Sequence, residues 1–389
     1  MTKKSNLLII SLLITIALFI YLTVHHFALK LGLGGNSLCE INSKINCDVA
    51  ATSSFAELAG IPIAILGGMF HLVLLSFILS LRLDWVESTK YAQKTIRAML
   101  LSSVAVSVVL GGVSLFVLKV VCPFCVGTYV FSFINLFLGW NVVQNLNGDF
   151  KFTNYFGEYK SHLITLLCVP ALSWVVSGMI QNSYGLDQIK QQIPEKLSVW
   201  ANSPAYSFDK NIGLSNGVAN PRITLVEFAD FKCPHCKSAS NAIDIFLKGK
   251  TDILFTYKPY PLDGNCNPAI QQKGDNSRCV LAAYALCAEK IAKKGWDMHH
   301  WIFEKQERLF NVTDAKTLLP EIQNDLGLDK SQMADCADSA EIYDVINKST
   351  QEGTTAKVEG TPTVYMNGKK LPWGQFLEVL NAAAKQAGK

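Results

Sequence analysis

The sequence predicts a multi-pass α-helical membrane bundle of five transmembrane helices with a four-helix core, followed by an α/β domain with a helical insertion. Half of the residues are hydrophobic, and this apolar excess lies mostly before Ile180, whereas Lys, Asp, Asn and Gln are frequent beyond it. The early part contains five apolar runs, each close to the roughly 20 residues that a helix needs to cross a bilayer. The 389 residues therefore divide into a membrane domain at 1–181, a linker at 182–220 and an outer domain at 221–389.

The five apolar runs are the predicted transmembrane helices. They are Leu7 to Phe27, Ile61 to Leu81, Ala98 to Leu118, Val126 to Val143 and Leu163 to Ile180. The first run follows Lys3 and Lys4, as a cleaved signal peptide would, but it is too long for one, and no small-x-small cleavage site follows it. We therefore expect this run to remain in the mature protein as an anchor.

Charged residues predict the orientation of the bundle and exclude one class of partner. Basic residues gather at alternate flanks of the runs, at Lys3, Lys4, Arg82, Lys90, Lys94, Arg97, Lys151 and Lys160. Such flanks lie on the cytoplasmic side, so we expect the N-terminus there and, after an odd number of spans, the C-terminal domain on the other side. The net charge of +4 is spread along the chain, which disfavours nucleic acid as a partner. The apolar runs make the lipid bilayer the expected partner.

Eleven cysteines supply the main functional evidence. Ten of them divide into pairs, and Cys168 stands alone in the fifth run. Such a density outside the cytoplasm indicates an oxidising compartment such as a periplasm. Two pairs have the Cys-x-x-Cys spacing: Cys122 with Cys125 (the membrane pair) and Cys233 with Cys236 (the C-terminal pair). This spacing lets one thiolate attack a foreign disulfide while its neighbour resolves the mixed intermediate.

The C-terminal pair has a strong local context. Residues Ile223 to Phe228 are strand-like, Phe231 to Cys236 turn into a helix, and Ser238 to Leu247 continue that helix. The Cys233 sulfur is therefore expected at a helix N-terminus, where unpaired N–H groups and the macrodipole stabilise a thiolate. His235 adds a hydrogen-bond donor, or a positive charge when it is protonated.

The C-terminal domain resembles a known superfamily. Downstream of the Cys-Pro-His-Cys motif, Val358 to Gly368 predicts two strands joined by an Asn-Gly hairpin turn. With the motif, the chain from Pro221 onward resembles the thioredoxin superfamily, and its long helical insertion resembles the DsbA-like branch. The resemblance implies a cis peptide bond at Thr361–Pro362 against the active-site cysteines, and a buried acid, Glu227, that assists proton movement. A trans turn and an ordinary strand acid are the alternatives.

The N-terminal part carries a second resemblance. Cys39 and Cys47 (the loop pair) are eight residues apart in the first outer loop. The pattern continues with Ser53, Phe55 and Gly60-Ile-Pro62, and the membrane pair is followed by Thr128 and Tyr129. This combined spacing, over residues 1 to about 180, resembles the vitamin K epoxide reductase family, whose bacterial members fused to a thioredoxin-like domain share the five-span layout. The alternative is that the loop and membrane pairs are structural disulfides.

The second resemblance implies an electron relay. Substrate thiols would reduce the C-terminal pair, which would reduce the loop pair. Cys47 would then pass electrons to Cys122, leaving Cys125 to face a membrane quinone of the ubiquinone or menaquinone type. The clients would be reduced exported proteins, and the chain would lie in a bacterial inner membrane with its C-terminal domain in the periplasm. Three residues would line the quinone pocket, with helix packing as the alternative: Ser53, Phe55 and Tyr129.

Four cysteines in the insertion are expected to form structural disulfides. They allow three pairings. We favour Cys266 with Cys279, because this bond closes a short loop rich in Gly, Asn and Pro, and Cys287 with Cys336, because this bond joins two helix-like stretches.

Three histidines are candidate functional groups. His71 lies in the second run, and an ionisable group inside a membrane is a functional candidate by default. A neutral histidine bonded to a neighbouring helix is the alternative. His299 and His300 have no second ligand cluster at metal spacing, so no metal is predicted.

Two other functions stay open. A conduit that carries electrons outward would need a cysteine pair on the inner side, and the sequence has none there. An anchored metallochaperone could bind a soft metal through Cys233, His235 and Cys236. That function leaves the loop pair and the membrane pair unexplained. We therefore expect a quinone-dependent thiol–disulfide oxidoreductase that generates disulfide bonds in exported proteins.

Overall fold

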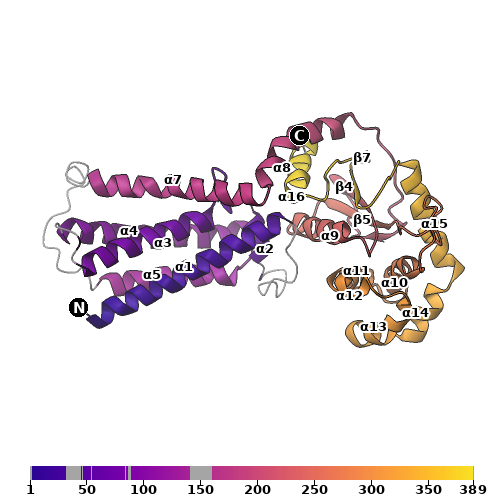
Figure 1. Ribbon diagram of the computed structural model, residues 1–389, viewed down its shortest axis with the longest axis horizontal. Helices are drawn as coiled ribbons and strands as arrows, with labels where there is room; N and C mark the ends of the chain where they lie inside the picture. The colour runs from indigo at the N-terminus through magenta and orange to yellow at the C-terminus, as the bar shows by residue number, and fades with distance from the viewer. Residues whose placement is uncertain are drawn as a thin grey trace. The chain divides into compact units, whose positions relative to one another are not determined.

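The computed structural model describes residues 2–31, 45, 47–53, 55–83, 85, 89–140 and 160–388 (Figure 1). The chain forms two compact units, and the main boundary between them lies between Gln188 and Ile189. The first unit consists of helices α1 (Thr2–Lys30), α2 (Cys47–Thr52), α3 (Ile63–Arg82), α4 (Thr89–Gly112), α5 (Pro123–Trp140) and α7 (Lys160–Ser183), a π-helix (Val113–Leu118) that continues α4, and strands β1 (Glu57–Leu58) and β2 (Ile61–Pro62).

Four helices of the first unit are long and apolar enough to cross a membrane. They are Ser5–Lys30, Ile63–Arg82, Ala92–Leu118 and Pro123–Trp140. They overlap the first four predicted spans, which are thereby confirmed as helices of suitable length and composition, although residues 141–143 at the end of the fourth span lie outside the described residues. The fifth predicted span lies within α7, but the side chains of residues 161–166 are outside the described part of the chain. Its membrane crossing stays a prediction.

The helices of the first unit pack through a shared apolar core. Figure 1 shows α1, α3, α4 and α5 running alongside one another, and α3 contacts α4 and α7 while α4 contacts α5. The buried residues of one cluster come from α1, α3 and α4: Leu8, Leu12, Leu74, Ile78, Ile96, Met99 and Leu100. Gly67 allows α1 to approach α3, since a Cβ there would lie 2.3 Å from the Phe19 ring. Small residues commonly serve this purpose between membrane helices.

The predicted linker contains a helix. In residues 182–220 the structure forms α8 (Leu186–Asn202) and strand β3 (Leu214–Ser215). Ile193, Leu197 and Trp200 recur with helical spacing on the more buried face of α8, although the segment is polar overall. The indole of Trp200 is buried, and its N–H donates to the carbonyl of Met366 at 3.1 Å. Part of this segment is therefore folded with the second unit, and the three domain boundaries stay predictions.

The second unit is built on a five-stranded sheet. Its strands lie in the order β3-β5-β4-β6-β7, and β4 (Ile223–Ala229) runs parallel to β5 (Ile253–Pro259), while the other neighbours are antiparallel. The remaining elements are α9 (Pro234–Leu247), α10 (Ser277–Ala292), α11 (Gly295–Glu304), α12 (Gln306–Leu309), a 3₁₀ helix (Ala315–Leu318), α13 (Leu319–Leu326), α14 (Lys330–Ala337), α15 (Ala340–Thr355), β6 (Thr363–Met366), β7 (Lys369–Lys370) and α16 (Leu377–Ala387).

The order of these elements confirms the predicted α/β domain with a helical insertion. A β4-α9-β5 unit is followed by the insertion, α10 to α15, and then by the β6-β7 hairpin and α16. The hairpin turns at Asn367 and Gly368, both with positive φ (51° and 75°). A two-residue turn with positive φ at both positions matches strand twist and favours Asn-Gly, so the turn was predictable from two adjacent residues.

Candidate redox sites

Cys233 caps the helix that follows the central strand. β4 ends at Ala229, and the chain turns so that Cys233 is the N-cap of α9 and Pro234 is its first residue. Proline costs no hydrogen bond there, because the first amides of a helix have no intrahelical partner. Cys233 is 8% exposed, whereas Cys236 is fully buried. The C-terminal pair therefore offers one partly accessible sulfur and keeps the other covered.

Hydrogen bonds favour a thiolate at Cys233. Donation from the Cys236 thiol, followed by the Thr361 hydroxyl and the backbone N–H groups of Cys236 and His235, lowers the pKa of Cys233 to about 5, while burial opposes this change. While Cys233 is a neutral thiol, the Thr361 hydroxyl has no hydrogen-bond partner among the described residues, so it is available to donate to the thiolate once Cys233 ionises. The His235 imidazole is exposed, so its proposed role stays a prediction. At neutral pH Cys233 is mainly in the reactive, ionised form.

Burial raises the pKa values of Cys236 and Glu227. Burial, then the hydrogen bond with Cys233 and the charge of Glu227, raises the pKa of Cys236 well above its usual value. Glu227 is 0% exposed, and neither of its carboxylate oxygens has a partner within the described chain. Burial, followed by the negative charges of Asp244 and Cys233, raises the pKa of Glu227 to about 8. A carboxyl group with this pKa can give or take a proton near neutral pH.

The predicted cis peptide bond is confirmed. Thr361–Pro362 is cis, and it precedes β6 in the loop opposite α9. The carbonyl oxygen of Thr361 accepts a hydrogen bond from the neutral Cys233 thiol at 3.3 Å. The contact that the thioredoxin resemblance implied between these residues and the C-terminal pair is therefore present.

Two polar side chains that sequence reasoning missed hold the turn before α9. The Gln306 side chain donates to the carbonyls of Phe231 and Cys233 at 2.8 and 2.9 Å. The buried Asp230 carboxylate accepts from the backbone N–H of Lys232 at 2.6 Å. Buried peptide groups need such partners, because an unpaired one is costly. These contacts fix the backbone that carries the C-terminal pair.

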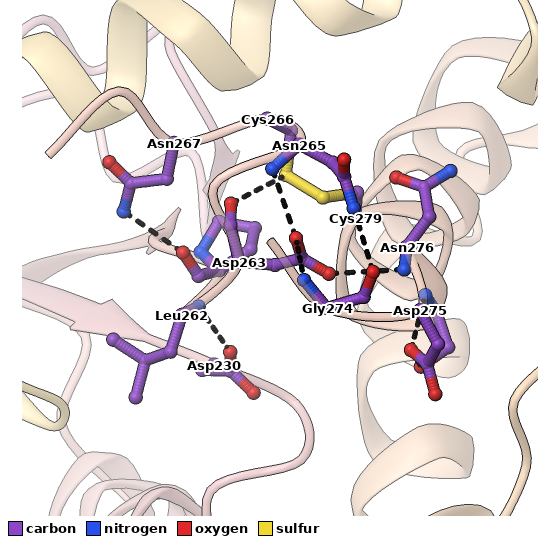
Figure 2. The surroundings of a disulfide bond; sticks show 12 residues. Asp230, Leu262, Asp263, Asn265, Cys266, Asn267, Gly274, Asp275, Asn276 and Cys279 are labelled. Atoms are coloured by element: carbon purple, nitrogen blue, oxygen red, sulfur yellow. Dashed lines mark hydrogen bonds between the residues drawn. A yellow bond between two sulfur atoms is a disulfide. The ribbon is translucent and has the colours of Figure 1, made fainter. Parts of the chain in front are cut away.

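Asp230 also joins this turn to the insertion. Its carboxylate accepts from the Arg278 guanidinium and from the backbone N–H of Leu262, each at 2.6 Å. Figure 2 shows the Leu262 bond close to the disulfide between Cys266 and Cys279. Arg278 directly precedes Cys279, so neighbouring residues at the start of α10 form the ion pair with Asp230 and the disulfide with Cys266.

The insertion cysteines form both of the favoured pairs. Cys266 is bonded to Cys279, and Cys287 is bonded to Cys336. The second disulfide joins α10 to α14, in agreement with the expectation that it would tie two helices together.

The membrane pair lies at the start of α5. Pro123 begins the helix, Cys122 precedes it, and Cys125 is in the first turn. The backbone N–H of Cys125 donates to the Cys122 sulfur at 3.2 Å. Both cysteines are free thiols, with Cys122 buried and Cys125 partly buried.

Cys47 lies next to the membrane pair. Cys47 and Cys122 share one buried hydrophobic cluster, against which Cys125 also packs. A short backbone bridge between Ile45 and Val121 runs alongside. The structure therefore brings one member of the loop pair to the membrane pair. The other member, Cys39, is outside the described residues, so its part in the relay stays a prediction.

An apolar cavity of about 380 Å³ adjoins the membrane pair. Cys122, Cys125 and the three residues predicted to contact a quinone, Ser53, Phe55 and Tyr129, all line it. Small-molecule sites commonly have volumes of roughly 300–1,000 Å³ and mostly apolar walls. The cavity therefore has the size and polarity of a site for an apolar ring beside two thiols.

His71 also lines this cavity and is bonded to a neighbouring helix. Its Nε2 atom lies 3.2 Å from the hydroxyl of Ser103 in α4. This contact agrees with the alternative given for His71, a neutral histidine bonded to a neighbouring helix. Ser103 is in turn bonded to Ser132, and Ser107 is bonded to Ser132 as well. The sequence did not indicate these three residues, because serines in an apolar run carry no functional pattern.

Two further histidines attach the C-terminal end of α1 to neighbouring elements. His26 contacts the carbonyl of Ala51 through Nδ1 at 2.8 Å and the carboxylate of Glu57 through Nε2 at 3.1 Å. His25 lies 3.0 Å from the carboxylate of Asp48. These contacts attach α1 to α2 and β1, the segment that begins with Cys47. The sequence does not indicate these contacts, since each joins residues more than 20 positions apart.

His299 and His300 lie in α11. His299 is buried against the aromatic rings of Phe231 and Tyr257, and His300 contacts the carboxylate of Asp244 at 3.1 Å. Within the described ranges, no group of three or more His, Cys, Asp and Glu side chains is arranged to hold a metal ion. That the protein uses no metal stays a prediction.

Solved structures and curated sequences resemble parts of the chain. BdbD from Bacillus subtilis aligns with a TM-score of 0.41 and 18% identity, covering 48% of this chain and 97% of that one. The α-DsbA2 protein from Wolbachia pipientis aligns with a TM-score of 0.37 and 22% identity, covering 51% and 95%.

Curated relatives are of two kinds. Disulfide bond formation protein D of Bacillus subtilis is 28% identical over 164 residues, which are 38% of this chain and 65% of the relative. A probable disulfide bond formation protein D of Bacillus anthracis is 27% identical over 175 residues, 42% of this chain and 72% of the relative. The Na(+)/H(+) antiporter NhaA 3 of Salinispora tropica is 29% identical over 175 residues, 44% of this chain. The chain spans about a quarter (24%) of that antiporter's length.

Family profiles match both units. Residues 6–140 match the vitamin K epoxide reductase family, and residues 224–383 match the DSBA-like thioredoxin domain. The first range contains the membrane pair and the cavity, and the second contains the C-terminal pair with the cis Thr361–Pro362 bond. The chain therefore joins a domain of the vitamin K epoxide reductase family to a DSBA-like thioredoxin domain.

Proposed function

We propose that this protein is a thiol–disulfide oxidoreductase that forms disulfide bonds in exported proteins and delivers the electrons to a membrane quinone. The observation that carries the proposal is the adjacency of Cys47, the free membrane pair and an apolar cavity. A thiol relay needs sulfurs that can reach contact distance, and a lipid-soluble acceptor needs an apolar site beside the last pair.

The first step oxidises a client at the C-terminal pair. A client thiolate attacks the Cys233 sulfur of the oxidised pair, and Cys236 leaves and takes up a proton. A second client thiolate then attacks the client sulfur of the mixed disulfide, and Cys233 leaves. The client loses two electrons and two protons. The pair gains both electrons, Cys236 takes one proton, and the other passes to solvent because Cys233 stays a thiolate. The pKa of Cys233, about 5, favours this direction because a stabilised thiolate is a good leaving group.

Glu227 supports proton transfer in this step. Its negative charge contributes to the raised pKa of Cys236, which indicates that the two groups are near each other in the buried interior. Cys236 must gain a proton when it leaves and lose one when the pair is oxidised again. A carboxyl group with a pKa of about 8 can exchange that proton at neutral pH.

Two exchanges and one quinone reduction complete the relay. The C-terminal pair reduces the loop pair, and Cys47 then passes the electrons to Cys122. When the membrane pair becomes a disulfide, its two electrons and two thiol protons convert a quinone into a quinol. Tyr129 is one helical turn beyond Cys125 and lines the same cavity, so its hydroxyl is the proposed partner of one quinone oxygen. Ser53 and Phe55 are proposed to contact the ring.

The protein is proposed to lie in a bacterial inner membrane. The four apolar helices support membrane insertion, and the basic flanks support a cytoplasmic N-terminus and a periplasmic C-terminal domain. Reduced exported proteins and the quinone pool are then the two partners. Similarity to the antiporter covers about a quarter of its length (24%), which does not support a transport function.

Reconstitution of the full-length protein with a reduced client and a soluble quinone tests the function. We expect one quinol for each client disulfide formed. In Cys47→Ala, rapid alkylation and peptide mapping should reveal a mixed disulfide between Cys39 and Cys233. In Cys125→Ala, a mixed disulfide between Cys47 and Cys122 should accumulate. Normal quinol production by Cys47→Ala would overturn the relay.

A matched control and a metal assay accompany this experiment. Cys168→Ala removes a free, exposed thiol that the relay does not use, and it should leave quinol formation unchanged. The rival function, a metallochaperone, predicts tight copper(I) or zinc binding by the reduced C-terminal pair and His235. Metal binding at unit stoichiometry together with no quinol formation would favour that rival.

A further inference from the structure

The cavity beside the membrane pair contains a buried polar cluster. His71 of α3, Ser103 and Ser107 of α4, and Ser132 of α5 line it, and none of these residues is more than 8% exposed. We name these four residues the serine–histidine cluster. The rest of the lining is predominantly apolar. Buried hydroxyl and imidazole groups are costly in such surroundings unless they are hydrogen bonded.

The hydrogen bonds of His71 assign its tautomer. Its Nδ1 atom lies 2.8 Å from the backbone carbonyl of Gly67, which can only accept, so Nδ1 carries the proton. In the neutral ring Nε2 is then an acceptor, and it receives the hydroxyl of Ser103 at 3.2 Å. The Ser103 hydroxyl also lies 3.0 Å from that of Ser132, and the Ser107 hydroxyl lies 3.1 Å from it.

The cluster offers more acceptors than it has protons. Each serine hydroxyl has one proton. Ser103 can donate to His71 or to Ser132, and Ser107 can donate to Ser132 or to the backbone carbonyl of Ser103, 2.9 Å away. Ser132 donates to the carbonyl of Thr128 at 2.9 Å. The hydroxyls can therefore exchange partners by rotation. A ligand oxygen can accept a hydrogen bond from Ser103 or Ser107, and a ligand hydroxyl can donate one to the lone pairs of His71 or Ser132.

Ser132 of the cluster lies on the same side of α5 as Cys125. Cys125, Thr128, Tyr129 and Ser132 follow one another at intervals of three, one and three residues, and all line the cavity. Ser132 is seven residues beyond Cys125, about 10 Å along the helix axis. A para-quinone has oxygens at opposite edges of its ring. When one oxygen faces Tyr129 near the membrane pair, the other faces along α5 toward Ser132.

We propose that the serine–histidine cluster binds the second oxygen of a para-quinone, by donating to the carbonyl of the quinone and accepting from the hydroxyl of the quinol. This inference rests on the proposed function. The cluster has no redox role: the electrons come from the membrane pair, which becomes a disulfide, and the two thiol protons released match the two that the quinol carries. Hydroxyl groups suit this site because they both donate and accept.

Two matched inhibitors test the inference in the full-length protein. 4-Methoxy-1-naphthol has oxygens at both ring edges, and 4-ethyl-1-naphthol replaces the second oxygen with a methylene of similar size. Each is measured as a competitive inhibitor of 1,4-naphthoquinone reduction. We expect the wild type to bind the methoxy compound about tenfold more tightly, the value of one buried hydrogen bond. Ser103→Ala/Ser107→Ala removes both donors and should lose most of this preference and raise KM for the quinone by a similar factor.

Two control variants separate a lost hydrogen bond from a packing defect. Ser103→Thr keeps the hydroxyl and should keep the preference. Ser80→Ala removes a hydroxyl of α3 that bonds to the backbone of Ser76 and does not line the cavity, so it should resemble the wild type. Full preference in the double alanine variant, or no preference in the wild type, would overturn the inference and leave quinone reduction standing. Failure of the wild type to reduce 1,4-naphthoquinone with a reduced client would overturn the proposed function instead.

Discussion

Replacing Glu227 with Gln should stabilise the second unit at neutral pH and leave it unchanged in acid. The Glu227 carboxyl is fully buried, and neither oxygen has a partner in the described chain. Burial is the main reason that its pKa rises from 4.5 to about 8. Below pH 4.5 the group is protonated in both the folded and the unfolded chain. As pH rises from 4.5 to 8, the unfolded chain releases the proton and the folded chain keeps it, so stability falls.

The size of the effect follows from these two pKa values. Each pH unit inside this window costs about 1.4 kcal/mol, which makes about 3 kcal/mol between pH 4.5 and pH 7. Gln has nearly the same shape and no charge, so the variant avoids this loss. The cost of burying its amide is the same at every pH. The difference in stability between Glu227→Gln and the wild type should therefore grow by about 3 kcal/mol from acid to neutral pH.

Hydrogen exchange with mass spectrometry measures this difference in the full-length protein. The opening free energy of β4 and β5 peptides, corrected for the intrinsic exchange rate at each pH, is compared between the wild type and Glu227→Gln. Glu307→Gln is the matched control, because the Glu307 side chain is 94% exposed and should show no pH-dependent difference. A difference between Glu227→Gln and the wild type that does not change with pH would refute the reasoning.

Two further predictions concern the turn that carries the C-terminal pair. The rate of Cys233 alkylation by iodoacetamide should rise with pH through a midpoint near 5. Thr361→Val should move that midpoint upward, because a donor to the thiolate is lost. Peptide mass spectrometry after timed quenching measures the alkylation rate of both proteins. Arg278→Met should lower the opening free energy of β4 by about 2 kcal/mol, since the buried Asp230 loses a charged donor. Asp230→Asn should recover part of that loss in the double variant, and full additivity of the two changes would contradict a direct bond between them.

Features encoded by neighbouring residues could be predicted from the sequence. The apolar runs, the two Cys-x-x-Cys motifs and the Asn367–Gly368 turn each depend on a few consecutive side chains. The strand before Cys233 and the helix after it followed from local patterns in the same way. For these features the backbone has few alternatives, so the local pattern suffices.

Contacts between distant segments could not be predicted. Arg278 is 48 residues from Asp230, and Gln306 is 73 residues from Cys233. Nothing near either residue indicates such a partner, because tertiary packing decides it. The helix α8 was missed for a related reason: its segment is polar overall, and Trp200 becomes informative only when the carbonyl of Met366 is known to lie beside it.

The disulfides of the insertion have a consequence for the biogenesis of the protein. Cys266–Cys279 and Cys287–Cys336 close loops with sequence separations of 13 and 49 residues. Constraining the unfolded chain in this way commonly contributes about 3 to 4 kcal/mol for each bond. Under the proposed function, each new copy would acquire these two disulfides from copies made before it. Activity should then return after depletion with a lag that a small residual population shortens.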